Sequence, residues 1–152
     1  MLTINLVCVG NLKEKFWQDA EREYAKRLSK FCNLKIIEIG EANEAKEIDK
    51  ILAFEGKSIL SHCKGYGILM AIEGKNLSSE DFAKEIQSLS LETSQITFVI
   101  GGSYGVSKEV KDKILKKISF GKSTFPHNLA RIMLLEQIYR AFMINSGAKY
   151  HK

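Results

Sequence analysis

The chain has 152 residues, of which 45% are hydrophobic and 27% are charged, and it carries a formal net charge of +5. This length fits one domain, and this composition supplies a packed core, so a disordered chain is excluded. The positive charge favours an anionic partner, although charge alone does not identify one.

Strand-like and helix-like segments alternate along the whole chain. In chain order the patterns predict a strand over 3–9, a helix over 13–31, a strand over 34–39, a helix over 45–63 and a strand over 67–72. They then predict a helix starting at Ser78, a strand over 95–100, a helix capped by Ser107, a short strand over 118–120 and a helix over 128–145. Alternation of this kind indicates an α/β fold with a mostly parallel sheet flanked by helices.

Three of the expected helices carry apolar residues at helical spacing. The stripe of the first helix includes Phe16, Ala20, Tyr24, Leu28 and Phe31; that of the third, Phe82, Ile86 and Leu89; and that of the fourth, Val110, Ile114 and Leu115. We expect each stripe to face the sheet.

The last expected helix, over 128–145, is apolar around most of its circumference. A helix of this kind must be buried on more than one side. Either a second subunit covers it, or it lies between other elements of the same chain. We favour the first explanation and expect a homodimer.

The cysteines are odd in number, form no CxxC pair and fit a reducing cytoplasm: Cys8, Cys32 and Cys63. The apolar N-terminal segment lacks a basic leader and predicts a strand, not a signal peptide. No apolar run reaches the roughly 20 residues that a membrane helix needs. We therefore expect a cytoplasmic protein without a membrane partner.

Two glycine-containing segments suggest ligand sites. Residues 101–105 (GGSYG) follow a buried strand, where α/β folds bind ligands. They do not match GxGxxG, so a ligand site and a tight turn are both possible.

Residues 121–124 (GKST) resemble the end of a phosphate-binding loop. Lys116 stands where that motif needs its first glycine, so we exclude a nucleotide triphosphatase. The histidines lack the spacing of metal ligands, and we expect no metal site.

Four stretches together resemble a bacterial ribosomal RNA methyltransferase family of the SPOUT class, over essentially the whole chain. They are Val7-Cys8-Val9-Gly10-Asn11-Leu12-Lys13-Glu14-Lys15, Val99-Ile100-Gly101-Gly102-Ser103-Tyr104-Gly105, Thr124-Phe125-Pro126-His127 leading into Arg131, and Glu136-Gln137-Ile138-Tyr139-Arg140-Ala141-Phe142 with the terminal Tyr150-His151. The resemblance implies one SPOUT methyltransferase domain over 1–152, with a C-terminal trefoil knot, a rare exception to the rule against knots. It also implies a homodimer that uses S-adenosylmethionine to methylate N3 of a pseudouridine in 23S rRNA on the assembled ribosome.

Carried over position by position, the resemblance implies these cofactor contacts: Met70, Gly101, Phe120, Gly121, Lys122, Ser123, Thr124 and Phe125. The family often has leucine in place of Met70, and apolar packing survives that change. We expect the loop over 120–125 to act mainly through its backbone. A flat apolar slot edged with backbone groups suits adenine, and glycine at 101 allows close approach of the backbone.

Methylation at N3 removes an imide proton and spreads negative charge onto the flanking carbonyl oxygens. Our hypothesis is that Arg140 stabilises this charge, while Tyr150 and His151 position the base and assist proton removal. These residues lie at the end of a packed helix, so we expect the tail that carries Tyr150 and His151 to be held near a packed surface. His127 has no assigned role, because a position at the start of the last helix accounts for it equally well.

Several cations are candidates to neutralise RNA phosphates, unless they form an ordinary solvated face: Lys13, Lys15, Arg22, Lys26, Lys149 and Lys152. We expect one subunit to hold the cofactor while the other helps to dock the RNA, which would be recognised by its folded shape and one extruded base.

Two other interpretations of the function stay open: a noncatalytic ribosome-binding or assembly factor, and a flavodoxin-like or nucleotide-handling enzyme.

Overall fold

A computed structural model describes residues 1–42 and 46–152. Its elements follow the order β1 (Thr3–Val9), α1 (Lys15–Leu28), β2 (Asn33–Ile39), α2 (Ile48–His62), β3 (Tyr66–Asn76), α3 (Ser79–Glu92), β4 (Gln95–Ile100), α4 (Lys108–Lys113), β5 (Lys116–Ser119) and α5 (His127–Asn145). Within the described ranges, no helix combines the length and apolarity needed to cross a bilayer.

The strands form one sheet in the order β2-β1-β4-β3-β5, and every neighbouring pair is parallel. This confirms the predicted α/β fold with a parallel sheet and flanking helices. The pairing of β3 with β5 shifts register between Met70 and Lys75, which both pair with Ile118, so the intervening residues of β3 form a bulge. In this bulge, residues 71–73 lie away from β5 and beside the cavity described below. The trefoil knot implied by the resemblance stays a prediction.

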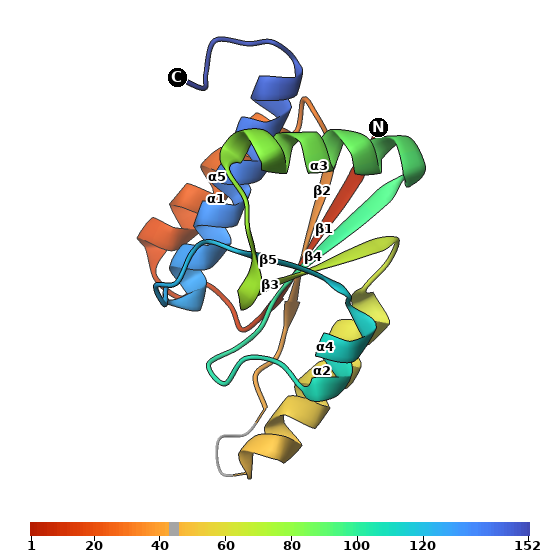
Figure 1. Ribbon diagram of the computed structural model, residues 1–152. Helices are drawn as coiled ribbons and strands as arrows, with labels where there is room; N and C mark the ends of the chain where they lie inside the picture. The colour runs from red at the N-terminus through yellow and green to blue at the C-terminus, as the bar shows by residue number, and fades with distance from the viewer. Residues whose placement is uncertain (43–45) are drawn as a thin grey trace.

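Both faces of the sheet are covered by helices (Figure 1). Because side chains alternate along a strand, Leu6 points into a core shared with α1, α3 and α5, whereas Val7 points into a smaller core shared with α2 and α4. The mainly apolar sequences of β1 and β4 follow from this burial on both faces, and the buried Asn5 and Thr97 are joined by a hydrogen bond of 3.2 Å.

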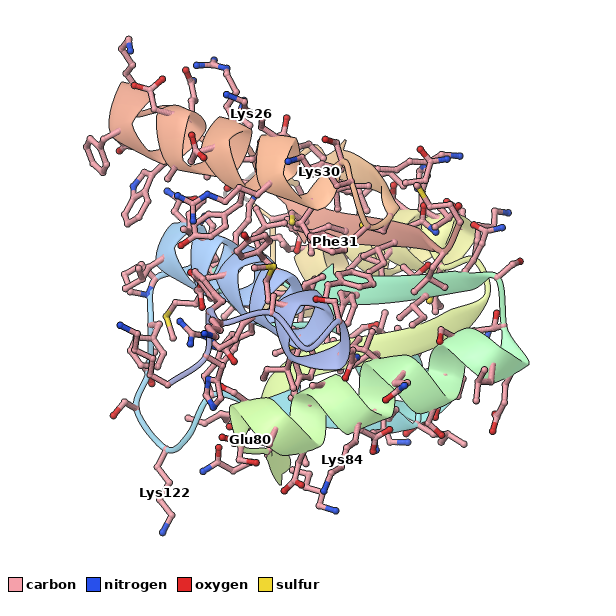
Figure 2. The ribbon with its side chains drawn as sticks, turned by 90° about the horizontal axis from the view of Figure 1, so that it is seen from above. Lys26, Lys30, Phe31, Glu80, Lys84 and Lys122 are labelled. Atoms are coloured by element: carbon pink, nitrogen blue, oxygen red, sulfur yellow. The ribbon has the colours of Figure 1, made fainter. Side chains whose placement is uncertain are left out.

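Helix α5 lies between α1 and α3, as Figure 2 shows in the view from above. Leu134, Leu135 and Ile138 are fully buried against these helices and the sheet. The alternative that the sequence left open, a helix flanked within its own chain, therefore accounts for much of its apolar surface. The homodimer stays a prediction that rests on the resemblance.

A buried ion pair fixes the first half of α5 in place. The Arg131 side chain is 4% exposed, and its Nε donates to Glu21 Oε2 of α1 at 2.6 Å. Its Nη2 donates to Glu38 Oε2 of β2 at 2.9 Å. A guanidinium this buried needs both partners, because an unpaired buried charge is costly.

Two residues predicted to face the core are exposed instead. Leu115 is 83% exposed, because α4 ends at Lys113 and only Val110 and Ile114 reach the core. Phe16 is 63% exposed, because it lies in the first turn of α1 and packs on Trp17 at a ring distance of 5.0 Å.

Several predicted boundaries also differ from the observed ones. Helix α1 spans residues 15–28, not 13–31, and Phe31 follows it. Strand β3 extends to Asn76, because it pairs with β5 again beyond the register shift. Strand β5 spans residues 116–119, because its pairing with β3 begins at Lys116. The expected start of the second helix at residue 45 lies outside the described residues, and α2 is observed from Ile48.

Candidate active site

A cavity of about 710 Å³ opens where β3 separates from β5 and where β4 and β5 end. Segments far apart in the sequence supply its walls: residues 70–73 from β3, residues 100–106 after β4, and residues 118–130 from β5 through the first turn of α5. We call this cavity the cleft. It lies at the carboxyl ends of parallel strands, the usual ligand position in open α/β sheets.

The cleft brings together most of the residues to which the resemblance gave a cofactor role. Its walls include Met70, Gly101, Phe120, Gly121, Ser123, Thr124 and Phe125. Lys122 is not among the lining residues, and Figure 2 shows its side chain extending away from the molecule. His127 begins α5 and also lines the cleft.

The glycine-containing turn after β4 is both a tight turn and part of the cleft wall. Gly105 adopts a φ of +78°, and its amide donates to Gly102 O at 3.0 Å. A Cβ added to Gly101 would lie 2.7 Å from Val106 Cγ1 and 2.8 Å from Gly105 O. Only glycine therefore fits at 101 without moving the turn.

An ion pair lies at the polar side of the cleft. Glu73 and Lys111 both line it, and their side chains are 3.2 Å apart. A hydrogen bond from its own backbone amide, and then the contact with Lys111, lower the pKa of Glu73. The sequence analysis missed both residues, because neither belongs to a motif and their pairing depends on the separation of β3 from β5.

The three predicted catalytic residues lie together at the C-terminal end of α5. Arg140 Cζ lies 4.7 Å from the centre of the Tyr150 ring, in a cation–π contact. Arg140 Nη1 lies 3.1 Å from His151 Nδ1. Tyr150 and His151 are half-buried, so the tail is held against the packed helices, as expected.

The partners of the two ring nitrogens assign a tautomer to His151. An arginine has only donors, so Nδ1 of His151 must accept the hydrogen bond from Arg140. The other ring nitrogen, Nε2, then carries the proton and donates to Glu80 Oε1 at 2.5 Å. This contact lowers the pKa of Glu80. In this arrangement, neither nitrogen of His151 offers a lone pair to a substrate.

Glu136 connects the predicted catalytic residues, and the sequence analysis did not single it out. Its Oε1 accepts a hydrogen bond from Arg140 Nε at 2.7 Å, and its Oε2 accepts one from Tyr150 at 2.8 Å. Tyr24 of α1 also donates to Oε2, at 3.2 Å. The i,i+4 spacing of Glu136 and Arg140 was a usable signal for the first contact. Nothing local indicates the contact with Tyr24.

A smaller cavity of about 260 Å³ lies between the cleft and these residues. It shares Met70, Ile118, Ser119 and Phe120 with the wall of the cleft, and Glu136 forms part of its own wall. The cleft and the side chains around Glu136 are therefore neighbouring parts of one region.

The cations predicted to contact RNA are exposed: Lys13, Lys15, Arg22, Lys26, Lys149 and Lys152. Lys15 and Arg22 share Asp19, at 2.7 and 2.9 Å, which reduces the charge that they present. Figure 2 shows Lys26 on the outer side of α1, and Lys30 just after the end of this helix. Over residues 1–42 and 46–152, no group of three potential metal ligands occurs.

Comparison with known proteins identifies the class that this fold and site define. The family model described as "Predicted SPOUT methyltransferase" matches residues 2–151. The chain belongs to the SPOUT methyltransferase family.

Its relatives point to a particular member of that class. The chain is 50% identical to the "Ribosomal RNA large subunit methyltransferase H" of Lactobacillus helveticus (strain DPC 4571), across 99% of this chain and 100% of the relative. It is 50% identical to the protein of the same name from Lactobacillus acidophilus, and 48% identical to that from Latilactobacillus sakei subsp. sakei, with the same coverage.

Proposed function

We propose that this chain transfers a methyl group from S-adenosylmethionine to N3 of a pseudouridine in 23S rRNA on the assembled ribosome. Residues 1–152 would form one SPOUT domain that acts as a homodimer in the cytoplasm. The observation that carries the proposal is the cleft, which gathers all the residues to which the resemblance gives a cofactor role except Lys122. Full-length relatives named as ribosomal RNA methyltransferases support the substrate class.

The cleft suits S-adenosylmethionine in size and chemistry. Its volume of about 710 Å³ lies in the range of small-molecule sites. Met70, Ile118 and Phe120 supply apolar walls for an adenine ring, and the bare Cα of Gly101 allows the ligand to approach the backbone. When bound, the sulfonium supplies an activated methyl group, so the reaction needs no metal.

Methyl transfer forms a bond from N3 to the methyl carbon, breaks the bond from carbon to sulfur and releases the N3 proton. Arg140 is placed to stabilise the negative charge that develops on the imide oxygens. Its Nη2 is the guanidinium nitrogen that neither Glu136 nor His151 engages. The aromatic ring of Tyr150, packed under Arg140, offers a surface next to which the base is held.

The contact of Arg140 with His151 suggests how the proton is removed. While Arg140 donates to Nδ1, His151 cannot accept a proton there. If the bound base draws Nη1 of Arg140 away from Nδ1, while Nε stays bound to Glu136, that lone pair is released. His151 then accepts the N3 proton at Nδ1, while Glu80 stabilises the resulting imidazolium through Nε2.

The first experiment measures methyl incorporation from labelled S-adenosylmethionine into purified, unmodified ribosomes, with naked 23S rRNA alongside. We expect label at N3 of one pseudouridine in the assembled ribosome. A folded protein that binds the ribosome but incorporates no label would contradict the proposal and favour a noncatalytic ribosome-binding factor.

A second experiment tests whether the two subunits share the work. Mixed dimers would carry Gly101→Val in one subunit and Arg140→Ala in the other. If one subunit holds the cofactor and its partner supplies Arg140 where the RNA docks, each mixed dimer keeps one intact site and regains activity. Uniformly inactive mixtures would show that the subunits do not divide the roles in this way.

A further inference from the structure

We propose that Glu136 is a positioning residue, whose carboxylate holds Arg140 and Tyr150 in the arrangement that methyl transfer requires. This inference rests on the function proposed above, because it assigns a role within the same site. The observation behind it is that three donors from three parts of the chain meet at one carboxylate: Tyr24 of α1, Arg140 of α5 and Tyr150 of the C-terminal tail.

The two oxygens of Glu136 accept hydrogen bonds from different residues. Oε1 accepts one from Nε of Arg140 at 2.7 Å, which fixes the plane of the guanidinium and leaves its two outer nitrogens free of Glu136. Oε2 receives both tyrosine hydroxyls, at 2.8 Å from Tyr150 and 3.2 Å from Tyr24. Tyr24 thereby ties the carboxylate to α1, so Glu136 cannot follow Arg140 if that side chain rotates.

The surroundings of Glu136 strengthen these contacts. Its side chain is 20% exposed and that of Arg140 is 25% exposed, so both charges are partly shielded from water. Tyr139 packs edge-on against Tyr150 with ring centres 5.0 Å apart, which limits the movement of the tail. Charge-assisted hydrogen bonds in such a setting are stronger and better directed than those of an exposed ion pair.

The position of Glu136 also connects it to the substrate side of the site. It forms part of the wall of the smaller cavity, which shares Met70, Ile118, Ser119 and Phe120 with the cleft. A residue that fixes Arg140 at this wall controls how the guanidinium faces a base beside the cofactor. Misplacement by about 1 Å lowers a rate by about a hundredfold in well-organised sites.

The test uses the full chain with Glu136→Gln, which keeps the size of the side chain and removes its charge. We expect the single-turnover rate of methyl transfer to ribosomes to fall by roughly tenfold to a hundredfold, with the dissociation constant of S-adenosylmethionine unchanged within about twofold. Asp112→Asn is the control, because Asp112 also makes an i,i+4 ion pair, with Lys108 Nζ at 2.8 Å, on the exposed surface of α4. This control should keep full activity.

A double-mutant cycle separates positioning from a merely structural role. If Glu136 acts through Tyr150, the double variant Glu136→Gln/Tyr150→Phe loses much less activity in total than the product of the two single losses. Full activity of Glu136→Gln, or losses that multiply, would overturn the proposal.

A second measurement does not depend on methyl transfer. NMR relaxation of the backbone amides of residues 147–152 reports whether the tail stays ordered. We expect Glu136→Gln to release the tail and to lower the pKa of the Tyr150 phenol, which burial and then Glu136 raise in the native protein. An unchanged tail and phenol would overturn the positioning role. An inactive wild-type protein whose tail Glu136→Gln releases would overturn only the proposed methyl transfer.

Discussion

The cleft and the side chains around Glu136 are neighbouring regions that differ in what shapes them: backbone geometry in the first, and side-chain contacts in the second. The cleft depends on the absence of a side chain. The bare Cα of Gly101 and the turn to Gly105 leave space at the end of β4. The region around Glu136, which we call the proposed catalytic region, depends on side-chain contacts, because Arg140, Tyr150 and His151 are held by contacts of 2.5–3.1 Å.

This difference indicates which functions can be lost separately. Adding an atom to the cleft should weaken cofactor binding, whereas removing atoms from the proposed catalytic region should slow methyl transfer without affecting that binding. Helix α5 is common to both regions, since His127 lines the cleft at its first residue and Arg140 lies near its last turns.

The largest effect is expected for Arg140→Ala. If Arg140 stabilises the imide oxygens as proposed, loss of its guanidinium should lower the single-turnover rate by about a hundredfold to a thousandfold. The dissociation constant of S-adenosylmethionine, measured by calorimetry, should stay within about twofold, since Arg140 does not line the cleft. Lys113→Ala, which breaks an exposed i,i+4 pair with Glu109 on α4, is the control. Cofactor binding that weakens together with the rate would show that the two regions are not separable.

The next effect concerns the helix that the two regions share. Arg131→Met leaves Glu21 and Glu38 without their common partner, and we expect the free energy of unfolding to fall by about 3 kcal/mol. This is the lower end for a buried ion pair, because the Glu38 side chain is 43% exposed. Urea unfolding measures the change, and Arg22→Met, at a side chain 74% exposed, should shift stability by less than about 0.5 kcal/mol. An equal small change in both variants would mean that Arg131 does not anchor α5.

The sequence predicted those features that depend on local pattern. The apolar run of β4 followed by glycines indicated both a buried strand and a turn at its end. The resemblance then assigned residues 120–125 to the same site, although a loop of this kind has no periodicity of its own.

The missed features depend on contacts between segments distant in the sequence. Glu80 meets His151 across 71 positions, and Tyr24 meets Glu136 across 112. Leu115 was misplaced for the opposite reason: the helical pattern was continued past Lys113, where the chain turns into β5. Such a short helix provides too few repeats for its period to define its end.

Gly101→Ala tests the cleft directly. The added Cβ would lie 2.7 Å from Val106 Cγ1 and 2.8 Å from Gly105 O, so the turn must move. Displacement or strain of roughly 1–3 kcal/mol corresponds to a loss of about tenfold to a hundredfold in affinity for S-adenosylmethionine. Gly40→Ala is the matched control, because a Cβ there meets nothing within 4 Å. Unchanged affinity in Gly101→Ala would remove the turn from the binding site.

The smallest effect is expected for Lys122→Ala. Its side chain extends into solvent, whereas the neighbouring Gly121 and Ser123 line the cleft. If the loop over 120–125 contacts the cofactor through its backbone, removing this ammonium leaves the affinity for S-adenosylmethionine unchanged within about twofold. Titration calorimetry at low and high salt provides the measurement, since an ionic contact would be screened by salt. A salt-dependent loss of affinity would show that the loop turns its lysine toward the carboxylate of the bound cofactor. The cleft would then rely on a charged side chain, as the proposed catalytic region does, and the contrast between backbone and side-chain construction would no longer hold.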